Sequence, residues 1–356
     1  MLRMLFVSLC LLALAVPAAA DTLRVPKDYD TIQDAVHAAD DGDVIKISKG
    51  TYPETVRISG ALGLTLKAAG QVVIDGEGVR QALDIEDSVH ITVVGVTVLA
   101  GTGHGIRIVE SADVTITKCR IESCVDSGVW IRNSARVTVS KCRVAECGEV
   151  GVEISDYQGE STDCTLTKNR IADVDREGIW TEGEGHDVSK NRISGTGEDG
   201  IRVRNGPCTI VKNRITEPGV DGILVHGDGN VVEKNKIKDA GGDGIDCDGD
   251  DGRILKNTIK VTTKAGIRIG ICNNCEIVSN KITSPGDNGI DVSGSPSLIM
   301  RNTVKGCEYI GYRLRSGGNE IIRNKAKKCH VDVVDDYPET SLYSKNSFDA
   351  PTPTQI

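Results

Sequence analysis

Four side chains capable of acid–base or metal chemistry recur at a fixed interval of 22 residues: Glu182, Arg204, His226 and Asp248. A second carboxylate, Asp246, lies two residues before Asp248, and Arg268 follows Asp246 by another 22 residues. Equal intervals bring side chains into contact when each interval is one turn of a stacked structure. Carboxylates beside imidazole and guanidinium groups can hold a hard cation or transfer protons to a substrate. The interval therefore needs a structural explanation.

A recurring phrase shows that the interval extends over most of the chain. Basic residues flank an asparagine in four ranges: Lys168–Ile171, Lys190–Ile193, Lys212–Ile215 and Lys234–Ile237. The asparagine returns every 22 or 23 residues, at Asn169, Asn191, Asn213, Asn235, Asn257, Asn280, Asn302, Asn324 and Asn346. Cys119 and Cys142 take its place upstream. A fixed period of this length predicts a repeat protein.

Each repeat also contains segments in which apolar and variable residues alternate, such as Gly200–Val203, Gly222–Val225 and Val137–Val139. Alternation with period two is typical of strands with one buried face. About three short strands per repeat, without helical periodicity, predict an all-β parallel β-helix in which like strands stack about 4.8 Å apart. The repeated asparagine then lies at one bend of every coil, where its amide can bond the coils on both sides.

The N-terminal residues add a phrase of their own: Val25–Pro26, Thr31–Val36, Gly42–Ile45 and Gly50–Glu54. Together with the repeats, this phrase makes the chain resemble right-handed parallel β-helix proteins of the pectate-lyase-like superfamily, which include polysaccharide-acting enzymes and periplasmic NosD-type proteins. The resemblance covers roughly residues 22–346. It implies a right-handed single-stranded β-helix solenoid with coils of about 22 residues. A short helix from Asp30 or Thr31 through Ala39 is expected to cap the first coil.

Residues 1–20 have the features of a signal peptide: a basic start, an apolar run and a small-residue cleavage site ending at Ala20. The apolar run is too short to span a bilayer, and no later segment is apolar enough. We therefore expect a secreted or periplasmic protein without membrane insertion, and a monomer. Its parts are predicted to be a cap with the first strands at 21–70, a β-helix at 71–346 and a tail at 347–356.

The charge balance bears on the class of partner. The chain carries 42 basic and 51 acidic side chains, a formal net charge of −9. Binding to a phosphate backbone needs a basic stripe. The acidic balance therefore argues against a nucleic-acid partner.

Cysteines recur in register with the repeats. Three pairs are one repeat apart: Cys119 with Cys142, Cys124 with Cys147, and Cys307 with Cys329. Cysteines in register on adjacent coils are close enough to form a disulfide in an oxidising compartment, or they can stack as buried thiols. The sequence favours neither. Cys272 and Cys275 form a CxxC without a second pair or a histidine at zinc-finger spacing, which predicts a local disulfide.

The period also fixes which residues form rows on the outside. The variable residue of each Gly-Ile-x-Val strand gives one row: Arg107, Trp130, Glu153, Trp180, Arg202, Leu224, Asp246, Arg268, Asp291 and Arg313. The residue two positions later gives a second row: Val109, Arg132, Ser155, Glu182, Arg204, His226, Asp248, Gly270, Ser293 and Arg315. Both tryptophans of the chain fall in the first row, two coils or about 10 Å apart, where indole rings can stack on alternate sugars of an extended polymer. The rows predict a polysaccharide-binding groove with these contacts: Trp130, Trp180, Glu182, Arg202, Asp291 and Arg313. A mixed-charge ladder of ion pairs is the alternative.

Three interpretations remain open for the central group of Asp246, Asp248, His226, Arg268 and Arg204. The resemblance to lyases of this fold implies that Asp246 and Asp248 bind Ca²⁺ against a uronate carboxylate, with Arg268 or Arg204 as the base. Alternatively, the two carboxylates, about 6–7 Å apart on one strand face, are the acid and base of an inverting glycoside hydrolase. In the third interpretation, the group is a neutralised ion-pair ladder without turnover. Calcium is the one candidate cofactor, and only the lyase interpretation requires it.

The leading hypothesis is an exported β-helix protein that binds an extended polysaccharide along its outer groove, with lyase or hydrolase cleavage as an open question. The alternative is a non-catalytic β-helix: an envelope scaffold, an adhesin or a NosD-type maturation factor. Asp199, Asp221 and Asp243, which each precede the glycine of a repeat, are interpreted as turn residues without a part in either function.

Overall fold

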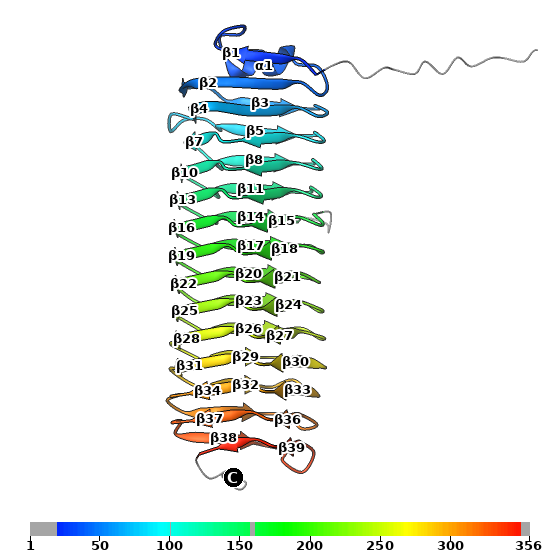
Figure 1. The fold of residues 1–356 in the computed structure, drawn as a ribbon, viewed down its shortest axis with the longest axis vertical. Coiled ribbons are helices and arrows are strands. Elements are labelled where there is room, and N and C mark those ends of the chain that lie inside the picture. The colour runs from blue at the N-terminus through cyan, green and yellow to red at the C-terminus, as the bar shows by residue number, and fades with distance from the viewer. Residues whose placement is uncertain (1–19, 100, 157–160, 350–356) are drawn as a thin grey trace, which may run out of the picture.

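The computed structural model describes residues 20–99, 101–156 and 161–349. Over these ranges the chain winds into a parallel β-helix whose coils follow one another along a single long axis (Figure 1). The expected signal peptide, residues 1–20, lies outside the described residues except for Ala20. The last part of the expected tail, 350–356, lies outside them as well. None of the helical segments described is both long and apolar enough to cross a membrane.

Each coil contributes one strand to each of three faces, which we name from their positions in Figure 1. The front sheet contains 13 parallel strands: β3 (Val56–Ser59), β5 (Leu83–Glu86), β8 (Ile106–Val109), β11 (Val129–Arg132), β14 (Val152–Ser155), β17 (Ile179–Glu182), β20 (Ile201–Arg204), β23 (Ile223–His226), β26 (Ile245–Asp248), β29 (Ile267–Ile269), β32 (Ile290–Val292), β35 (Ile310–Leu314) and β38 (Val331–Asp335).

The other strands form two stacks that merge at the N-terminal end. The right stack consists of β6 (Thr92–Val94), β9 (Thr115–Thr117), β12 (Thr138–Ser140), β15 (Thr165–Thr167), β18 (Asp187–Ser189), β21 (Thr209–Val211), β24 (Val231–Glu233), β27 (Arg253–Leu255), β30 (Cys275–Val278), β33 (Ser297–Met300), β36 (Glu320–Ile322) and β39 (Leu342–Ser344). The left stack consists of β7 (Thr97–Leu99), β10 (Arg120–Cys124), β13 (Arg143–Cys147), β16 (Arg170–Val174), β19 (Arg192–Thr196), β22 (Arg214–Pro218), β25 (Lys236–Ala240), β28 (Thr258–Thr262), β31 (Lys281–Pro285), β34 (Thr303–Lys305), β37 (Lys325–Lys327) and β40 (Ser347–Phe348). Three strands at the N-terminal end join the stacks: β1 (Thr22–Val25), β2 (Val44–Tyr52) and β4 (Thr65–Asp75), of which β4 pairs with both β6 and β7.

The core follows from the period-two alternation. Every second strand residue points inward, and most inner residues of the front sheet are isoleucines and valines stacked coil on coil. Ile179, Ile201, Ile223 and Ile245 are fully buried. Removing one such side chain from water contributes about 2 kcal/mol. The same three strands therefore recur in each coil because the same apolar positions recur in each repeat.

The predicted asparagine ladder is confirmed. The backbone N–H of Asn213 donates to Oδ1 of Asn235 at 2.8 Å, and the N–H of Asn235 donates to Oδ1 of Asn257 at 2.9 Å. Nδ2 of Asn235 donates to the carbonyl of Ile210 at 2.8 Å. Asn213, Asn235 and Asn257 are all buried, so these bonds satisfy polar groups at a corner that water does not reach.

The residue before each asparagine makes the corner between the right and left stacks. Lys168, Lys190 and Lys212 have φ angles of 59°, 61° and 61°. This left-handed region is unfavourable for residues other than glycine, and it persists where the surrounding hydrogen bonds fix the bend. The lysine side chains are exposed, so the corner is buried on its asparagine side and solvated on its lysine side.

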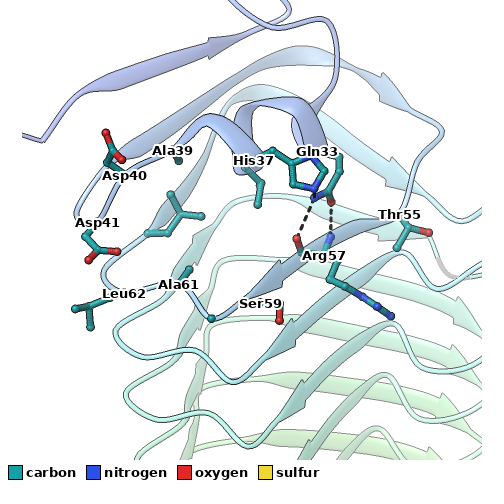
Figure 2. Close-up of a pocket in the computed structure, with 13 residues that line it drawn as sticks. Gln33, His37, Ala39, Asp40, Asp41, Thr55, Arg57, Ser59, Ala61 and Leu62 are labelled. Atoms are coloured by element: carbon teal, nitrogen blue, oxygen red, sulfur yellow. Dashed lines mark hydrogen bonds between the residues drawn. The ribbon is translucent and has the colours of Figure 1, made fainter.

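A short helix, α1 (Ile32–Ala38), covers the first coil as expected, and Thr31 is its N-cap residue. Figure 2 shows Gln33 of this helix bonded to the backbone of Arg57: its Oε1 accepts the N–H at 2.6 Å and its Nε2 donates to the carbonyl at 3.2 Å. A cavity of about 550 Å³ lies between α1 and the first coil. The helix hides the end of the core that no preceding coil covers.

Two of the cysteine expectations are resolved. Cys272 and Cys275 form the predicted local disulfide, and Cys307 is joined to Cys329 on the next coil. The other in-register cysteines are buried thiols: Cys119, Cys142, Cys124 and Cys147.

Candidate functional site

The two predicted outer rows lie on the front sheet. Backbone pairing places Glu182 beside Arg204, Arg204 beside His226, and His226 beside Asp248. These residues end β17, β20, β23 and β26, which follow one another down the centre of Figure 1. The 22-residue interval is therefore one coil, and the four residues recurring at that interval form a contiguous row.

Trp130 is half-buried in a cluster of nitrogen-bearing side chains. The imidazole of His104 stacks on its ring with centroids 4.6 Å apart. The guanidinium groups of Arg107 and Arg132 lie 5.9 and 5.7 Å from the ring centroid. The indole Nε1 donates to Oγ of Ser155 at 2.7 Å. His104 and the two arginines therefore lie against the ring, and a sugar could contact only the surface that they leave free.

Trp180 repeats this arrangement two strands further along. Arg176 and Arg204 lie 5.3 and 5.8 Å from its ring centroid. Its Nε1 is buried without a hydrogen-bond partner. Each tryptophan thus has two arginine guanidinium groups close to its ring, which stabilise the ring position and offer hydrogen-bond donors beside it.

The arginines of the rows are also paired with carboxylates. The pairs and their N–O distances are Arg107–Asp84 at 2.6 Å, Arg202–Glu177 at 2.6 Å, Arg268–Asp246 at 2.6 Å, Arg315–Asp291 at 2.8 Å, Arg313–Asp336 at 2.9 Å and Arg204–Glu182 at 3.6 Å. The predicted contacts Arg202, Asp291 and Arg313 therefore lie on the front sheet with their charges paired within the protein, and Asp291 is buried.

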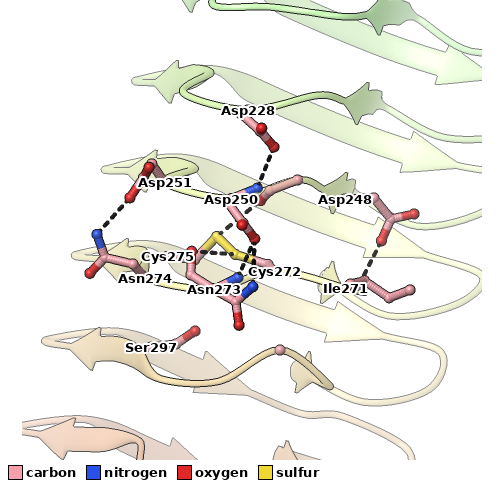
Figure 3. The surroundings of a disulfide bond; sticks show 12 residues. Asp228, Asp248, Asp250, Asp251, Ile271, Cys272, Asn273, Asn274, Cys275 and Ser297 are labelled. Atoms are coloured by element: carbon pink, nitrogen blue, oxygen red, sulfur yellow. Dashed lines mark hydrogen bonds between the residues drawn. A yellow bond between two sulfur atoms is a disulfide. The ribbon is translucent and has the colours of Figure 1, made fainter.

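Asp246 and Asp248 have different surroundings. Asp248 is partly exposed: its Oδ2 lies 3.5 Å from Nε2 of His226, and its Oδ1 accepts the backbone N–H of Ile271 at 3.1 Å. Figure 3 shows this last bond beside the Cys272–Cys275 disulfide. Asp246 is only 5% exposed, and its Oδ2 lies 2.6 Å from Nη1 of Arg268. The two carboxylates do not form an open pair around a substrate-sized space.

Asp199, Asp221 and Asp243 form a buried row next to the front sheet. Oδ1 of Asp199 accepts the N–H of Asp221 at 2.9 Å, Oδ1 of Asp221 accepts the N–H of Asp243 at 2.6 Å, and Oδ1 of Asp243 accepts the N–H of Ala265 at 2.7 Å. The turn function predicted for these residues is therefore present. It connects each coil to the next and uses only one oxygen of each carboxylate.

The structure brings Asp246 together with Asp221 and Asp243, and we call these three residues the acidic triad. One carboxylate oxygen from each lies within 4.8 Å of the other two, and all three side chains are buried. Burial and mutual repulsion raise the pKa of Asp243 to about 7. Burial raises the pKa of Asp246 to about 6, partly offset by Arg268. Three carboxylates at these distances can share protons or hold one hard cation.

A change in the neighbouring row explains why the triad is short of positive charge. Two coils before Asp243, Arg202 lies 2.6 Å from the fully buried Glu177 and 3.0 Å from Asp199. One coil later, Leu224 occupies the position of Arg202 in the row. Within the described part of the chain, Arg268 then provides the one guanidinium that pairs with the triad.

Sequence reasoning missed Asp221 and Asp243 because their turn role was sufficient to explain them. A signal was present: in Asp243–Asp246 a turn carboxylate lies three residues before a row carboxylate, and Asp221 lies one repeat earlier. In the coil of Asp221, the outer-row residue is Leu224 and not an arginine. The spacing of the repeats therefore already indicated an excess of negative charge at the next coil.

Comparison with protein families finds two matching models. The model described as right handed beta helix region matches residues 157–307, and the model described as periplasmic copper-binding protein (NosD) matches residues 41–226. The handedness and the fold predicted from the repeats are thereby confirmed. Among curated proteins, no sequence match is found.

Solved structures show the same fold at low sequence identity. The surface adhesin PfbA of Streptococcus pneumoniae is 14% identical, with a TM-score of 0.61 over 87% of this chain and 91% of the adhesin. The A-module of the Azotobacter vinelandii mannuronan C-5 epimerase AlgE6 is 15% identical, with a TM-score of 0.61 over 90% and 93%. The PL6 family alginate lyase AlyGC is 16% identical, with a TM-score of 0.62 over 89% of this chain and 53% of the lyase. At these identities the likeness establishes the fold alone.

Proposed function

The chain belongs to the family described as periplasmic copper-binding protein (NosD), and from this premise we propose that it is a periplasmic β-helix that binds an extended polysaccharide along its front sheet without cleaving it. The proposal combines the groove predicted from the sequence with the non-catalytic alternative. The mannuronan epimerase and the alginate lyase that share this fold support the class of ligand.

The observation that carries the proposal is the pair of tryptophans in one row, on β11 and β17. The parallel register sets them two strands, about 10 Å, apart along a straight sheet. Each ring has two arginine guanidinium groups against it, and Trp130 also stacks on His104, so two similar but not identical contacts lie along the axis on which a polymer would repeat. Glu182, Arg202 and Arg313 would extend this surface with hydrogen-bonding groups, whereas Asp291 is buried and bonded to Arg315.

The geometry of the carboxylates supports binding rather than cleavage. An inverting hydrolase needs two accessible carboxylates with a water between them. Asp246 is buried and paired with Arg268, whereas Asp248 bonds to the backbone of Ile271. In this proposal Asp246, Asp248, His226, Arg268 and Arg204 stabilise the front sheet through their polar contacts with one another and with Glu182.

Copper, which the family description names, does not fit the residues present. Copper sites use imidazole, thiolate or thioether donors. Among the described residues, the one group of three or more histidine, cysteine or acidic side chains with converging donor atoms is the acidic triad, which offers only carboxylate oxygens. The paired thiols of Cys124 and Cys147 are sealed in the core, and burial raises the pKa of Cys124 far above its usual range, which disfavours the thiolate that a metal needs.

The acidic triad fits a hard divalent cation such as calcium, and we assign the proposed calcium site to it in place of the Asp246–Asp248 pair. Carboxylate oxygens are the donors that calcium prefers. Oδ1 of Asp246 is buried without a hydrogen-bond partner, in a residue that is only 5% exposed. Such an atom is unfavourable unless a cation or a proton completes it. A bound cation would order β23 and β26 beneath the polysaccharide.

The test is binding of the purified protein to a panel of neutral and acidic polysaccharides, followed by tryptophan fluorescence. We expect binding to at least one extended polymer without release of unsaturated or reducing ends. Trp180→Ala should weaken this binding, whereas Trp180→Phe should retain most of it because a ring remains between Arg176 and Arg204. A protein that binds none of the polymers, or that releases new sugar ends, would contradict the proposal.

A further inference from the structure

A basic surface lies on the left stack, away from the front sheet. Its residues are the lysines and arginines immediately before and after each bend asparagine, or before and after Cys119 and Cys142 where a cysteine replaces it, and all are exposed. The residues before the bend are Lys118, Lys141, Lys168, Lys190, Lys212, Lys234, Lys256, Arg301, Arg323 and Lys345. The residues after it are Arg120, Arg143, Arg170, Arg192, Arg214, Lys236, Lys281 and Lys325. We call this set the basic ridge.

The corner geometry makes the ridge straight. The lysines before the bend share the left-handed backbone conformation, so the same corner recurs in each coil. The residues after the bend begin the strands of the left stack, where Arg170 pairs in register with Arg192, Arg192 with Arg214, and Arg214 with Lys236. Successive cations therefore follow the long axis at about 4.8 Å per coil. These strands form the left edge of Figure 1.

The central part of the ridge has no internal neutralisation. At the ends of this part, Glu122 lies near Arg120 and Arg143, and Glu233 lies near Lys234 and Lys256. Between them, within the described part of the chain, six consecutive ridge residues make no ion pair: Lys168, Arg170, Lys190, Arg192, Lys212 and Arg214. The front sheet is the opposite case, because its arginines are paired with carboxylates.

The fold does not require these cations. The ladder needs the asparagine, and its neighbours point into solvent. Ser279, Thr258 and Thr303 occupy equivalent positions on other coils, and the corner and strand are preserved there. Stacked like charges repel one another by a few tenths of a kcal/mol per pair. A repeated, unpaired and unfavourable arrangement points to an external anion.

A shallow groove of about 400 Å³ continues the ridge toward the C-terminal end. It is lined by Arg214, Thr216, Lys236, Lys238, Lys260 and Lys281, with strand residues between them. Acidic residues lie at the opposite ends of the strands: Asp173 and Glu217 come three positions after Arg170 and Arg214. The positive surface is therefore a narrow strip that follows the axis.

We propose that the basic ridge binds a linear acidic polysaccharide that carries a carboxylate on successive sugars. A straight strip with one or two cations per coil suits a straight polyanion, and arginine pairs with carboxylates through two parallel hydrogen bonds. The phosphates of a duplex instead wind around its axis. Single-stranded nucleic acid is held largely by base stacking on aromatic rings, and both tryptophans lie on the front sheet. This surface is separate from the front sheet and does not rest on the proposed function.

The ridge also revises the argument from net charge. The sequence has the formal charge −9, from which a basic stripe was not expected. The repeat segregates the charges by position, so that a chain with an acidic total carries a basic strip. The net charge therefore gives no ground for excluding polyanions at this surface.

The test compares binding of the intact protein and a triple variant, Arg170→Gln, Arg192→Gln and Arg214→Gln, to sodium alginate at 50 and 200 mM NaCl. We expect the intact protein to bind and to lose affinity as salt rises, because binding releases counterions. The triple variant should bind at least tenfold more weakly at 50 mM NaCl, with a flatter salt dependence. Glutamine is tolerated on an exposed strand position, and an unchanged melting curve verifies the fold.

A matched control removes three exposed lysines at the N-terminal end, several coils before the substituted arginines, in Lys27→Gln, Lys46→Gln and Lys67→Gln. It lowers the net charge equally and should bind alginate as the intact protein does. Trp180→Ala should also retain salt-dependent binding, which separates the ridge from the proposed groove. Equal affinity of the ridge variant and the lysine control overturns the proposal. The proposal is also wrong if the protein binds an oligonucleotide or anionic vesicles more tightly than alginate and the ridge variant loses that binding. In that case the ridge binds the tighter ligand instead of the polysaccharide.

Discussion

Replacing Asp243 by asparagine should stabilise the protein in the absence of divalent cations. The new side chain would keep the Oδ acceptor that receives the N–H of Ala265 at 2.7 Å, so the link to the next coil is preserved. It would remove one of three clustered negative charges that, among the described residues, pair with Arg268 alone. Raising a carboxyl pKa from 3.8 to about 7 corresponds to about 4 kcal/mol of stability lost at high pH.

The sign follows from proton binding. Because the folded-state pKa of Asp243 is raised, the folded protein binds more protons than the unfolded chain between about pH 4 and pH 7. The contribution of Asp243 is therefore fully favourable below this window and is lost as the pH rises through it. Asp243→Asn should gain roughly 2–4 kcal/mol at pH 8 and almost nothing at pH 4.

The measurement is urea unfolding of both proteins in a chelator at pH 4, 6 and 8. Asp199→Asn is the matched control: it occupies the same turn position two coils earlier, where Arg202 lies 3.0 Å from the carboxylate. The gain at pH 8 should be much smaller there, because the substitution also removes an ion pair. A loss of stability in Asp243→Asn at pH 8, or equal gains at both positions, would refute the account of the triad.

Further outcomes follow from the other sites. Calcium should raise the melting temperature of the intact protein, since a ligand bound only by the folded state stabilises it, and Asp243→Asn should abolish that rise; an equal rise in both proteins removes the calcium assignment. Asn235→Ala should cost roughly 1–3 kcal/mol, because it leaves buried partners unpaired, and an unchanged melting curve would contradict the ladder. Trp180→Ala should weaken polysaccharide binding by roughly 1–2 kcal/mol with little change in stability, and unchanged affinity would move the contact elsewhere.

The fold was predictable because its determinants repeat. The interval between bend asparagines measures one coil, and the alternation of apolar residues identifies the buried face of each strand. The rows of the front sheet follow from the same interval, so Arg204, His226 and Asp248 are neighbours in the structure as predicted. Register in a parallel stack is a property of spacing, which the sequence contains directly.

The properties of the site were less predictable because they depend on where side chains turn and on what covers them. The interval places Trp180 on the outside, but it does not show that Arg176 and Arg204 lie against the ring. It pairs Asp246 with Asp248 on one strand, whereas burial and the adjacent turn group Asp246 with Asp243. The basic ridge was hidden for another reason: the phrase that identified the ladder also carried its charges, and only the asparagine was interpreted.

Because the corner recurs in every coil, each repeat adds the same length to the molecule. Each coil touches only the coil before it and the coil after it, and the corners at Asn169, Asn191 and Asn213 use the same lysine, asparagine and arginine. Joining Asn191 directly to Arg214 would remove one complete coil and restore the same phrase across the junction. The protein would become shorter by about 4.8 Å, with its helix cap and its final coil unchanged. The number of repeats therefore sets the length of the molecule, and with it how many units of a partner can lie along either face.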